Sequence, residues 1–267
     1  MTTIFESPSA WRTERAARVG RGRTLGFVPT MGALHDGHLS LVRRSRAENE
    51  LTLVSIFVNP TQFDDAGDLA KYPRTLESDL AALRAEGTDF VLLPRESDLY
   101  PDGYRYRVTE NEQSRMMEGA HRPGHFDGVL TVVLKLLQIA SADRAYFGEK
   151  DWQQLVLVRG MAEAFFLPTA IVPCPTIREG DGLALSSRNR RLARADRLRA
   201  PRLHEVLVSA GSPEEASRDL RAAGFDVDYV EERDGRRLAA VRLGGVRLID
   251  NVPAAPAARV GGEGVRS

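Results

Sequence analysis

Residues 29–41 read PTMGALHDGHLSL and join a short apolar run to a helix-forming segment. The run before them, Thr24–Val28, is short enough for a buried strand, and Pro29 is expected to end it because proline cannot donate to a sheet ladder. The segment after them, Leu39–Asn49, is mostly polar and helix-forming. The sequence therefore predicts a strand, a turn that contains glycine and the start of a helix.

Two histidines, His35 and His38, fall at this predicted helix start. There the first N–H groups lack partners and the helix dipole favours negative charge. Gly32 and Gly37 lack a Cβ, so a base or a phosphate can approach the backbone closely. Imidazoles three residues apart can donate hydrogen bonds to one phosphate as charge builds in a transition state. We expect phosphate chemistry here, while helix capping and metal ligation remain alternatives, although Asp36 nearby faces away at helical spacing.

The composition is that of an ordinary globular protein. The length of 267 residues suggests about two domains. Lysine plus arginine equals aspartate plus glutamate, 37 each, and a net charge of zero argues against a large nucleic-acid interface. The single cysteine, Cys174, excludes an internal disulfide and a cysteine-based zinc site. No apolar run reaches the roughly 18 residues of a membrane span and no signal-peptide pattern is present, so we expect a cytoplasmic protein.

Strand and helix patterns alternate through the first two thirds of the chain. Apolar runs begin near residues 24, 51, 89, 143 and 169, with helical patterns between them. This order predicts an α/β fold with a Rossmann-like, doubly wound parallel sheet. Within it, Tyr100–Thr109 alternates like an edge hairpin, and Val129–Ala140 has the clearest periodicity of a core helix.

Past Ile177 the pattern changes, which predicts a larger domain at residues 1–176 and a smaller α+β domain at residues 177–267. In the smaller domain two helical stretches precede an antiparallel set of strands at residues 226–232, 237–242 and 246–250. From Val252 onward proline, alanine and glycine dominate, which predicts a disordered tail.

Polar side chains follow the predicted strands at their carboxyl ends, where open α/β sheets bind ligands. Gln62 follows the strand at 51–58, and its amide can donate and accept, which suits a substrate with a carboxylate and a hydroxyl; the alternative is a turn residue. Lys150 follows the strand at 143–147 and opens a helix, where a cation is electrostatically unfavourable. It is therefore a candidate for phosphate binding, with a solvated surface lysine as the alternative. Gln154 lies one turn further on and faces the same way.

Two polar loops complete the candidates. The loop 178–189 ends in Ser186, Ser187 and Arg188, whose hydroxyls and guanidinium could clamp a polyphosphate, while a serine could instead cap the next helix. The glycine-rich loop 119–128 carries Arg122 between two histidines. It is either a mobile loop near the phosphates or a structural connection.

Six motifs, in this order and spacing, resemble those of one enzyme family. They are PTMGALHDGH, FVNPTQF, YPRT, RPGHFDGV, FGEKDWQQ and DGLALSSRN, spread from about Thr24 to Asn189. HDGH resembles the HxGH signature of the nucleotidylyl-transferase superfamily, and the whole set resembles the pantothenate synthetase (pantoate–β-alanine ligase) family. A plain adenylyltransferase would share the first motif only. The stretch from about Ala200 to Val227 is shorter than the norm of that family.

The resemblance implies a ligase that joins (R)-pantoate to β-alanine through a pantoyl-adenylate intermediate, in the biosynthesis of vitamin B5 and coenzyme A. It implies ATP as co-substrate, Mg²⁺ held mainly by the ATP phosphates, a homodimer, and a C-terminal domain that acts as a lid. It assigns pantoate to Gln62 and Gln154, and β-alanine to Gln62. The implied catalytic residues are His35, His38 (as the acid-type donor), Lys150, Ser186, Ser187 and Arg188. The implied ATP-binding residues are Met31, Gly32, Ala33, Leu34, His35, Asp36, Gly37, His38, Gly148, Glu149, Lys150, Asp151, Ile177, Leu185, Ser186, Ser187 and Arg188.

Two other functions remain alternatives on the sequence. A nucleotidyltransferase that couples ATP to a phosphorylated acceptor would use the same histidines, but it would leave the two glutamines unexplained. A catalytically silent nucleotide-binding protein would bind ATP without turnover. The implied ligase predicts instead that AMP forms only when pantoate and β-alanine are both present.

Overall fold

The computed structural model describes residues 1–19, 22–64 and 66–254. The chain divides into two compact units, Met1–Arg191 (unit 1) and Leu192–Ser267 (unit 2). The sequence pattern predicts a boundary between residues 176 and 177. The structure instead divides the chain after Arg191, so the loop 178–189 belongs to the same unit as the parallel sheet. Every candidate site residue therefore belongs to unit 1. Within the described ranges no helix combines the length and the apolar composition that crossing a bilayer requires.

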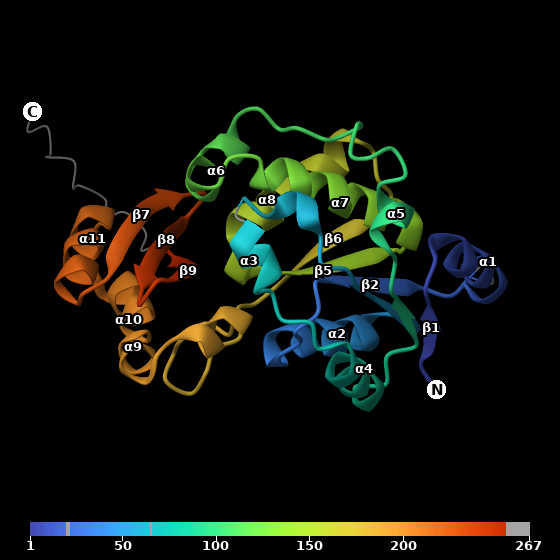
Figure 1. Ribbon diagram of the computed structural model, residues 1–267, viewed down its shortest axis with the longest axis horizontal. Helices are drawn as coiled ribbons and strands as arrows, with labels where there is room; N and C mark the ends of the chain where they lie inside the picture. The colour runs from blue at the N-terminus through green and yellow to red at the C-terminus, as the bar shows by residue number, and fades with distance from the viewer. Residues whose placement is uncertain (20–21, 65, 255–267) are drawn as a thin grey trace, which may run out of the picture. The chain divides into compact units, whose positions relative to one another are not determined.

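Unit 1 contains a six-stranded sheet in which every pair of neighbours is parallel (Figure 1). From β2 the chain proceeds through β3 to β4 on one side, and β5 and β6 are added on the other side. The strand order therefore reverses between β2 and β5, and ligands bind at such a reversal in open α/β sheets. The predicted doubly wound sheet is confirmed. In the order β1-β4-β3-β2-β5-β6, the strands are Thr3–Phe5, Phe90–Leu92, Leu51–Ile56, Leu25–Thr30, Arg144–Gly148 and Ala170–Cys174.

Helices cover both faces of this sheet (Figure 1). Neighbouring strand residues alternate between two cores: Phe27 packs in the cluster that includes α1, α7 and α8, and Val28 packs in the cluster that includes α2 and α4. The strands are thus buried on both sides, as their continuous apolar runs indicate. The helices are α1 Pro8–Arg18, α2 Asp36–Glu48, α3 Ala66–Ala70, α4 Leu76–Ala85, α5 Glu96–Leu99, α6 Glu118–His121, α7 His125–Ala140 and α8 Trp152–Ala164. Four short 3-10 turns are η1 Pro60–Gln62, η2 Gln113–Arg115, η3 Glu149–Asp151 and η4 Ser187–Arg191.

The prediction that Pro29 ends its strand is wrong, because Pro29 lies inside β2. Leu25 faces β5, because its carbonyl accepts the Asp143 N–H at 2.9 Å, and the alternation along a strand puts Pro29 on the same side. The register of β2 with β5 covers Gly26 and Phe27. The missing N–H of Pro29 thus falls where this ladder has already ended, so it costs no hydrogen bond.

One strand of the sheet was not predicted, and one predicted hairpin does not form. Thr3–Phe5 forms the edge strand β1 beside β4, although three residues are too few to show an alternating pattern. Tyr100–Thr109 does not form a hairpin. Two of its backbone N–H groups bond to side chains instead: Tyr106 donates to the Asp102 carboxylate at 2.8 Å, and Val108 donates to the Thr131 hydroxyl at 2.9 Å.

Unit 2 contains a three-stranded antiparallel sheet in the order β7-β8-β9, which confirms the predicted set of strands. Because Val252 and Pro253 belong to the last strand, the predicted tail does not begin at Val252. The remainder of that tail, residues 255–267, lies outside the described residues. The lid role of unit 2 stays a prediction. Its elements are α9 Arg194–Arg199, α10 Arg202–Ser209, α11 Pro213–Ala222, β7 Asp226–Arg233, β8 Arg236–Leu243 and β9 Val246–Pro253.

Candidate active site

The candidate residues lie on loops that follow four neighbouring strands of the parallel sheet. Met31–His38 follows β2, Gln62 follows β3, Lys150 follows β5, and Ile177 follows β6. These strands are adjacent in the order β3-β2-β5-β6, and the carboxyl ends of parallel strands share one edge of the sheet. The histidine loop and Lys150 therefore flank the reversal of strand order between β2 and β5.

The two histidines occupy the first turn of α2, as predicted. His35 is the N-cap residue, and its Nδ1 accepts the Gly37 N–H at 3.2 Å. The His35 and His38 rings lie 4.1 Å apart, centroid to centroid. Because Nδ1 of His35 accepts a hydrogen bond, the proton of the neutral ring is on Nε2, which can donate to a phosphate. Capping and phosphate binding are therefore compatible at this residue.

Both imidazoles are neutral at pH 7. Burial, followed by smaller contributions from His35 and Lys150, lowers the pKa of His38 from 6.5 to about 3. Burial, then Lys150 and Arg190, also lowers the pKa of His35. Nδ1 of His38 is buried and has no hydrogen-bond partner among the described residues, so it is an atom that a bound ligand could satisfy. Each ring can thus supply a neutral hydrogen bond to a phosphate rather than a full positive charge.

Lys150 and the loop that carries Leu185 converge on the histidines. The Lys150 side chain is 19% exposed, and its ammonium is close enough to lower the pKa of both imidazoles. A Cβ placed on Gly37 would lie 3.7 Å from the Leu185 Cβ. The Leu185 N–H in turn donates to the Ile177 carbonyl at 2.9 Å. Four of the predicted ATP-binding segments are therefore brought together.

Asn59, which was not predicted as a site residue, orients the amide of Gln62. Its Nδ2 donates to the Gly128 carbonyl at 3.2 Å and to Oε1 of Gln62 at 3.0 Å. Its Oδ1 accepts from the Tyr100 hydroxyl at 2.7 Å. Because the Gly128 carbonyl can only accept, the nitrogen of Asn59 must face it, and Gln62 must present its oxygen to Asn59. Nε2 of Gln62 therefore faces away from Asn59 and donates to the Met31 sulfur at 3.1 Å, on the side of the histidine loop.

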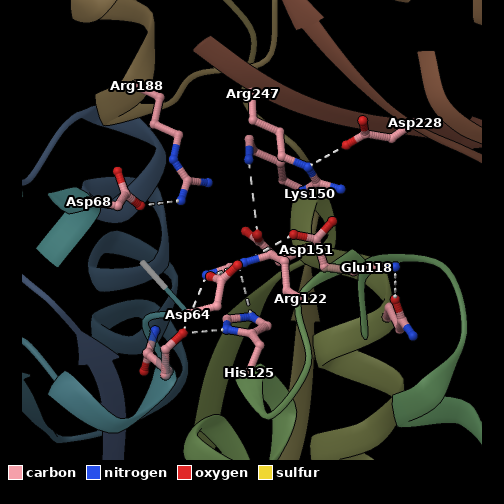
Figure 2. Close-up of polar contacts among 12 residues, drawn as sticks. Asp64, Asp68, Glu118, Arg122, His125, Lys150, Asp151, Arg188, Asp228 and Arg247 are labelled. Carbon is pink, nitrogen blue, oxygen red and sulfur yellow. Dashed lines mark hydrogen bonds and ion pairs between the residues drawn. The ribbon is translucent and has the colours of Figure 1, made fainter. Parts of the chain in front are cut away.

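The glycine-rich loop before α7 holds the backbone of Gln62. Nδ1 of His125 donates to the Gln62 carbonyl at 2.8 Å, and the Arg122 guanidinium donates to Nε2 of His125 at 3.2 Å. Figure 2 shows Arg122 beside Asp64 and Glu118 as well, with ion pairs of 3.0 and 3.3 Å. The loop 119–128 was predicted to be either a mobile loop near the phosphates or a structural connection, and these bonds support the structural connection.

Protonation of His125 is expected to destabilise the folded protein at low pH. Burial, and after it the charge of Arg122, lowers the pKa of His125 to about 4, whereas an unfolded histidine titrates near 6.5. Between these values the unfolded chain binds a proton that the folded chain excludes, so the stability present above pH 6.5 is lost as the pH falls. At pH 5 this loss amounts to about 2 kcal/mol.

Urea unfolding of His125→Asn at pH 7.5 and pH 5 measures this effect. The variant is expected to lose about 2 kcal/mol less than the wild type between the two pH values, because it has no proton to take up. His121→Asn, at an exposed histidine of the same loop, is the matched control and should keep the wild-type pH dependence. Equal losses in wild type and His125→Asn would contradict the prediction.

The predicted clamp residues are already held by neighbours. Arg188 forms an ion pair with Asp68 at 3.2 Å (Figure 2), and Ser187 hydrogen-bonds to Tyr72. Oγ of Ser186 accepts the Arg188 N–H at 3.2 Å, so the capping alternative holds for Ser186, which directly precedes the turn η4. Tyr72 lies in the YPRT motif and could have been singled out there. Asp68 carries no sequence signal of its own.

Gln154 lies in the first turn of α8 and is partly buried. The buried side chain next to it, Gln153, has a structural role, because it accepts the Glu118 N–H at 3.0 Å and donates to the Gln113 and Met116 carbonyls at 2.7 and 2.9 Å. Of these two neighbouring glutamines, Gln154 is therefore the one left for a substrate. Its contact with pantoate stays a prediction.

Comparison with known proteins identifies the family to which this geometry belongs. Residues 3–253 match the family model described as Pantoate-beta-alanine ligase. The chain belongs to the pantoate-beta-alanine ligase family. Among the curated relatives, a pantothenate synthetase of Bdellovibrio bacteriovorus is 52% identical over 94% of this chain and 99% of its own length. One of Coxiella burnetii is 50% identical over 95% of this chain and 97% of its own length.

Solved structures of pantoate-beta-alanine ligases share the whole fold. The enzyme of Francisella tularensis, complexed with Beta-gamma ATP and Beta-alanine, superposes with a TM-score of 0.90 at 40% identity and covers 95% of this chain and 98% of its own. The pantothenate synthetase of Thermus thermophilus has a TM-score of 0.88 at 39% identity, over 96% of this chain and all of its own. Membership of this family makes the protein an enzyme, a ligase.

Proposed function

We propose that this ligase condenses (R)-pantoate with β-alanine to give pantothenate, AMP and pyrophosphate through pantoyl adenylate, as a step toward coenzyme A. The observation that carries the proposal is the set of donors at the reversal of strand order. Two neutral imidazoles on the first turn of α2, the Lys150 ammonium and Nε2 of Gln62 come from three neighbouring strand ends. The Francisella relative, crystallised with Beta-gamma ATP and Beta-alanine, supports ATP and β-alanine as two of the three substrates.

The first step needs charge stabilisation on phosphate. A pantoate carboxylate oxygen attacks the α-phosphorus of ATP, and the bond from that phosphorus to pyrophosphate breaks. Negative charge grows on the leaving pyrophosphate, where Nε2–H of His35, an N–H of His38 and the Lys150 ammonium would donate. Arg188, Ser186 and Ser187 would bind the same phosphates, and the ion pair with Asp68 would orient Arg188.

The second step needs positioning more than charge. The β-alanine amine attacks the acyl carbon of pantoyl adenylate, the acyl–oxygen bond breaks, AMP leaves with that oxygen, and the amine loses a proton. A carboxylate oxygen is a poor leaving group until it belongs to a phosphate, which is why adenylation must come first. Nε2 of Gln62 would hold pantoate through both steps as a donor.

Mg²⁺ is proposed to accompany ATP. Proteins commonly hold this ion through one or two carboxylates together with substrate phosphates and water. In the described part of the chain no group of three or more His, Cys, Asp or Glu side chains is arranged to hold a metal ion. The donor set therefore fits an ion that is held mainly by the ATP phosphates, where it would neutralise part of their charge.

Product analysis with each substrate omitted in turn tests the proposed function. We expect AMP to accumulate only with ATP, pantoate and β-alanine together, and about one equivalent of pyrophosphate per enzyme to form from ATP and pantoate alone. Consumption of ATP at the same rate without pantoate or without β-alanine would refute the proposal. Light scattering on the purified protein would test the homodimer that the family resemblance implies.

Replacement of Gln62 should separate pantoate from ATP. Gln62→Ala removes the Nε2 donor and is expected to raise the KM for pantoate about 10- to 100-fold while the KM for ATP changes less than about threefold. Gln62→Glu should be worse, because a carboxylate would then face the pantoate carboxylate. Gln138→Ala, at an exposed glutamine of α7, is the control and should match the wild type. An equal rise in the KM for pantoate and the KM for ATP in Gln62→Ala would mean that Gln62 is only structural.

A further inference from the structure

Asp79, in α4, presents a buried carboxylate to the backbone of the histidine loop. Its residue surface is 3% exposed, and a carboxylate so buried needs hydrogen-bond donors. Oδ2 accepts the Ala33 N–H at 2.9 Å, and Oδ1 accepts the Leu34 N–H at 2.8 Å. The Thr75 hydroxyl also donates to Oδ2, at 3.1 Å. Both carboxylate oxygens are thus engaged by two consecutive peptide groups 45 and 46 residues away in sequence.

The peptide groups that Asp79 binds form an unusual turn. Gly32 and Ala33 both have positive φ, 77° and 51°, although Ala33 has a Cβ that disfavours this conformation. A Cβ on Gly32 would lie 3.0 Å from Oδ2 of Asp79, so glycine leaves the space that the carboxylate fills. A left-handed alanine persists only where its surroundings fix it. The Asp79 carboxylate supplies that restraint.

This turn determines where the first turn of α2 begins. Leu34 directly precedes the N-cap residue His35, and His38 lies in the same helical turn. A change in the direction of the Ala33 and Leu34 N–H groups would therefore rotate or shift both imidazoles. Catalytic hydrogen bonds do not tolerate such a shift, since a misplacement of about 1 Å can cost about 100-fold in rate.

We propose that Asp79 is a positioning residue that aims His35 and His38 at the phosphates of ATP. It acts through the backbone of Ala33 and Leu34 and not by contact with a substrate, because its oxygens already accept these N–H groups. The inference rests on the proposed adenylation step. It assigns a specific task to a side chain that helical periodicity would place in an ordinary packing face of α4.

Asp79→Asn tests this role with little change in shape. One carboxylate oxygen becomes an NH₂ group, which must face a backbone N–H, so one of the two bonds is lost. Pyrophosphate release from ATP and pantoate in a single turnover is expected to slow about 30- to 100-fold. The second half-reaction, from chemically prepared pantoyl adenylate and β-alanine, should change less than about threefold, because no pyrophosphate leaves in it.

Thr75→Val is the matched control. It removes the third hydrogen bond to Asp79 and leaves both backbone bonds, so pyrophosphate release should stay within about threefold of the wild type. A purely structural Asp79 would lower both half-reactions equally in Asp79→Asn, and that result would overturn the inference, as would no effect on either. A wild-type protein that releases no pyrophosphate from ATP and pantoate would instead refute the proposed function.

Hydrogen exchange on the wild-type protein needs no variant and decides the matter if Asp79→Asn fails to fold. The amides of Ala33 and Leu34 are expected to exchange as slowly as those in the centre of β2, because each is bonded to a buried carboxylate. Fast exchange at both amides would mean that the two bonds do not restrain the turn, and it would overturn the inference.

Discussion

Lys150→Ala is expected to lower the rate of pantoyl-adenylate formation by about 100-fold or more. The Lys150 side chain is 19% exposed and lies at the reversal of strand order, where its charge already lowers the pKa of both imidazoles. Opposite unit charges about 4 Å apart interact by on the order of 4 kcal/mol at an intermediate dielectric. Removal of the ammonium therefore withdraws stabilisation from the charge that grows on pyrophosphate. Rapid-quench measurement of pyrophosphate release gives the rate.

Two further lysine variants make this experiment specific. Lys150→Arg keeps the charge but changes its geometry and should fall between the wild type and Lys150→Ala. Lys71→Ala removes an exposed lysine of unit 1 and should keep the wild-type rate. A decrease of less than about threefold in Lys150→Ala would refute a phosphate role for this residue.

His38→Ala should have a comparable effect, with a loss of about 100-fold in adenylation. The pKa of His38 is lowered to about 3, mainly by burial, so the side chain acts as a neutral hydrogen-bond donor. His38→Gln retains a neutral donor and is expected to keep more activity than His38→Ala. His121→Gln, at an exposed histidine, is the control.

The pH dependence of His38→Gln tests the charge state of His38. Because the wild-type imidazole stays neutral, the ratio of wild-type to variant rates should be constant between pH 6 and pH 8. A ratio that rises toward pH 6 would show that the charged imidazolium is the active form, and it would contradict the neutral donor.

The predictable part of the fold rests on local patterns. Strands such as Leu51–Ile56 are mostly apolar runs, and the histidine turn combines glycines with a helix start, so both could be identified without tertiary information. Their carboxyl ends meet at one edge because the sheet is parallel. The positions of His35, Lys150 and Gln62 near one another follow from that rule alone.

The remaining features depend on contacts between distant parts of the chain. The acceptor side of Gln62 is engaged by Asn59, which is itself oriented by Tyr100, 41 residues further along. Asp79 reaches back 46 residues to Ala33. Pro29 is tolerated in a central strand because a neighbouring ladder stops two residues earlier. None of these contacts produces a periodic pattern in the sequence, because each depends on where a distant segment of the chain ends or packs.

Transfer of ¹⁸O from pantoate tests the central claim most directly, namely that a carboxylate attacks the α-phosphate of ATP beside the histidine turn. Pantoate labelled in both carboxylate oxygens is converted with ATP and β-alanine, and the products are analysed by mass spectrometry. The proposed chemistry predicts one labelled oxygen in AMP and one in the amide carbonyl of each pantothenate. Label in inorganic phosphate with ADP as the second product, or no label in any phosphate, would contradict it.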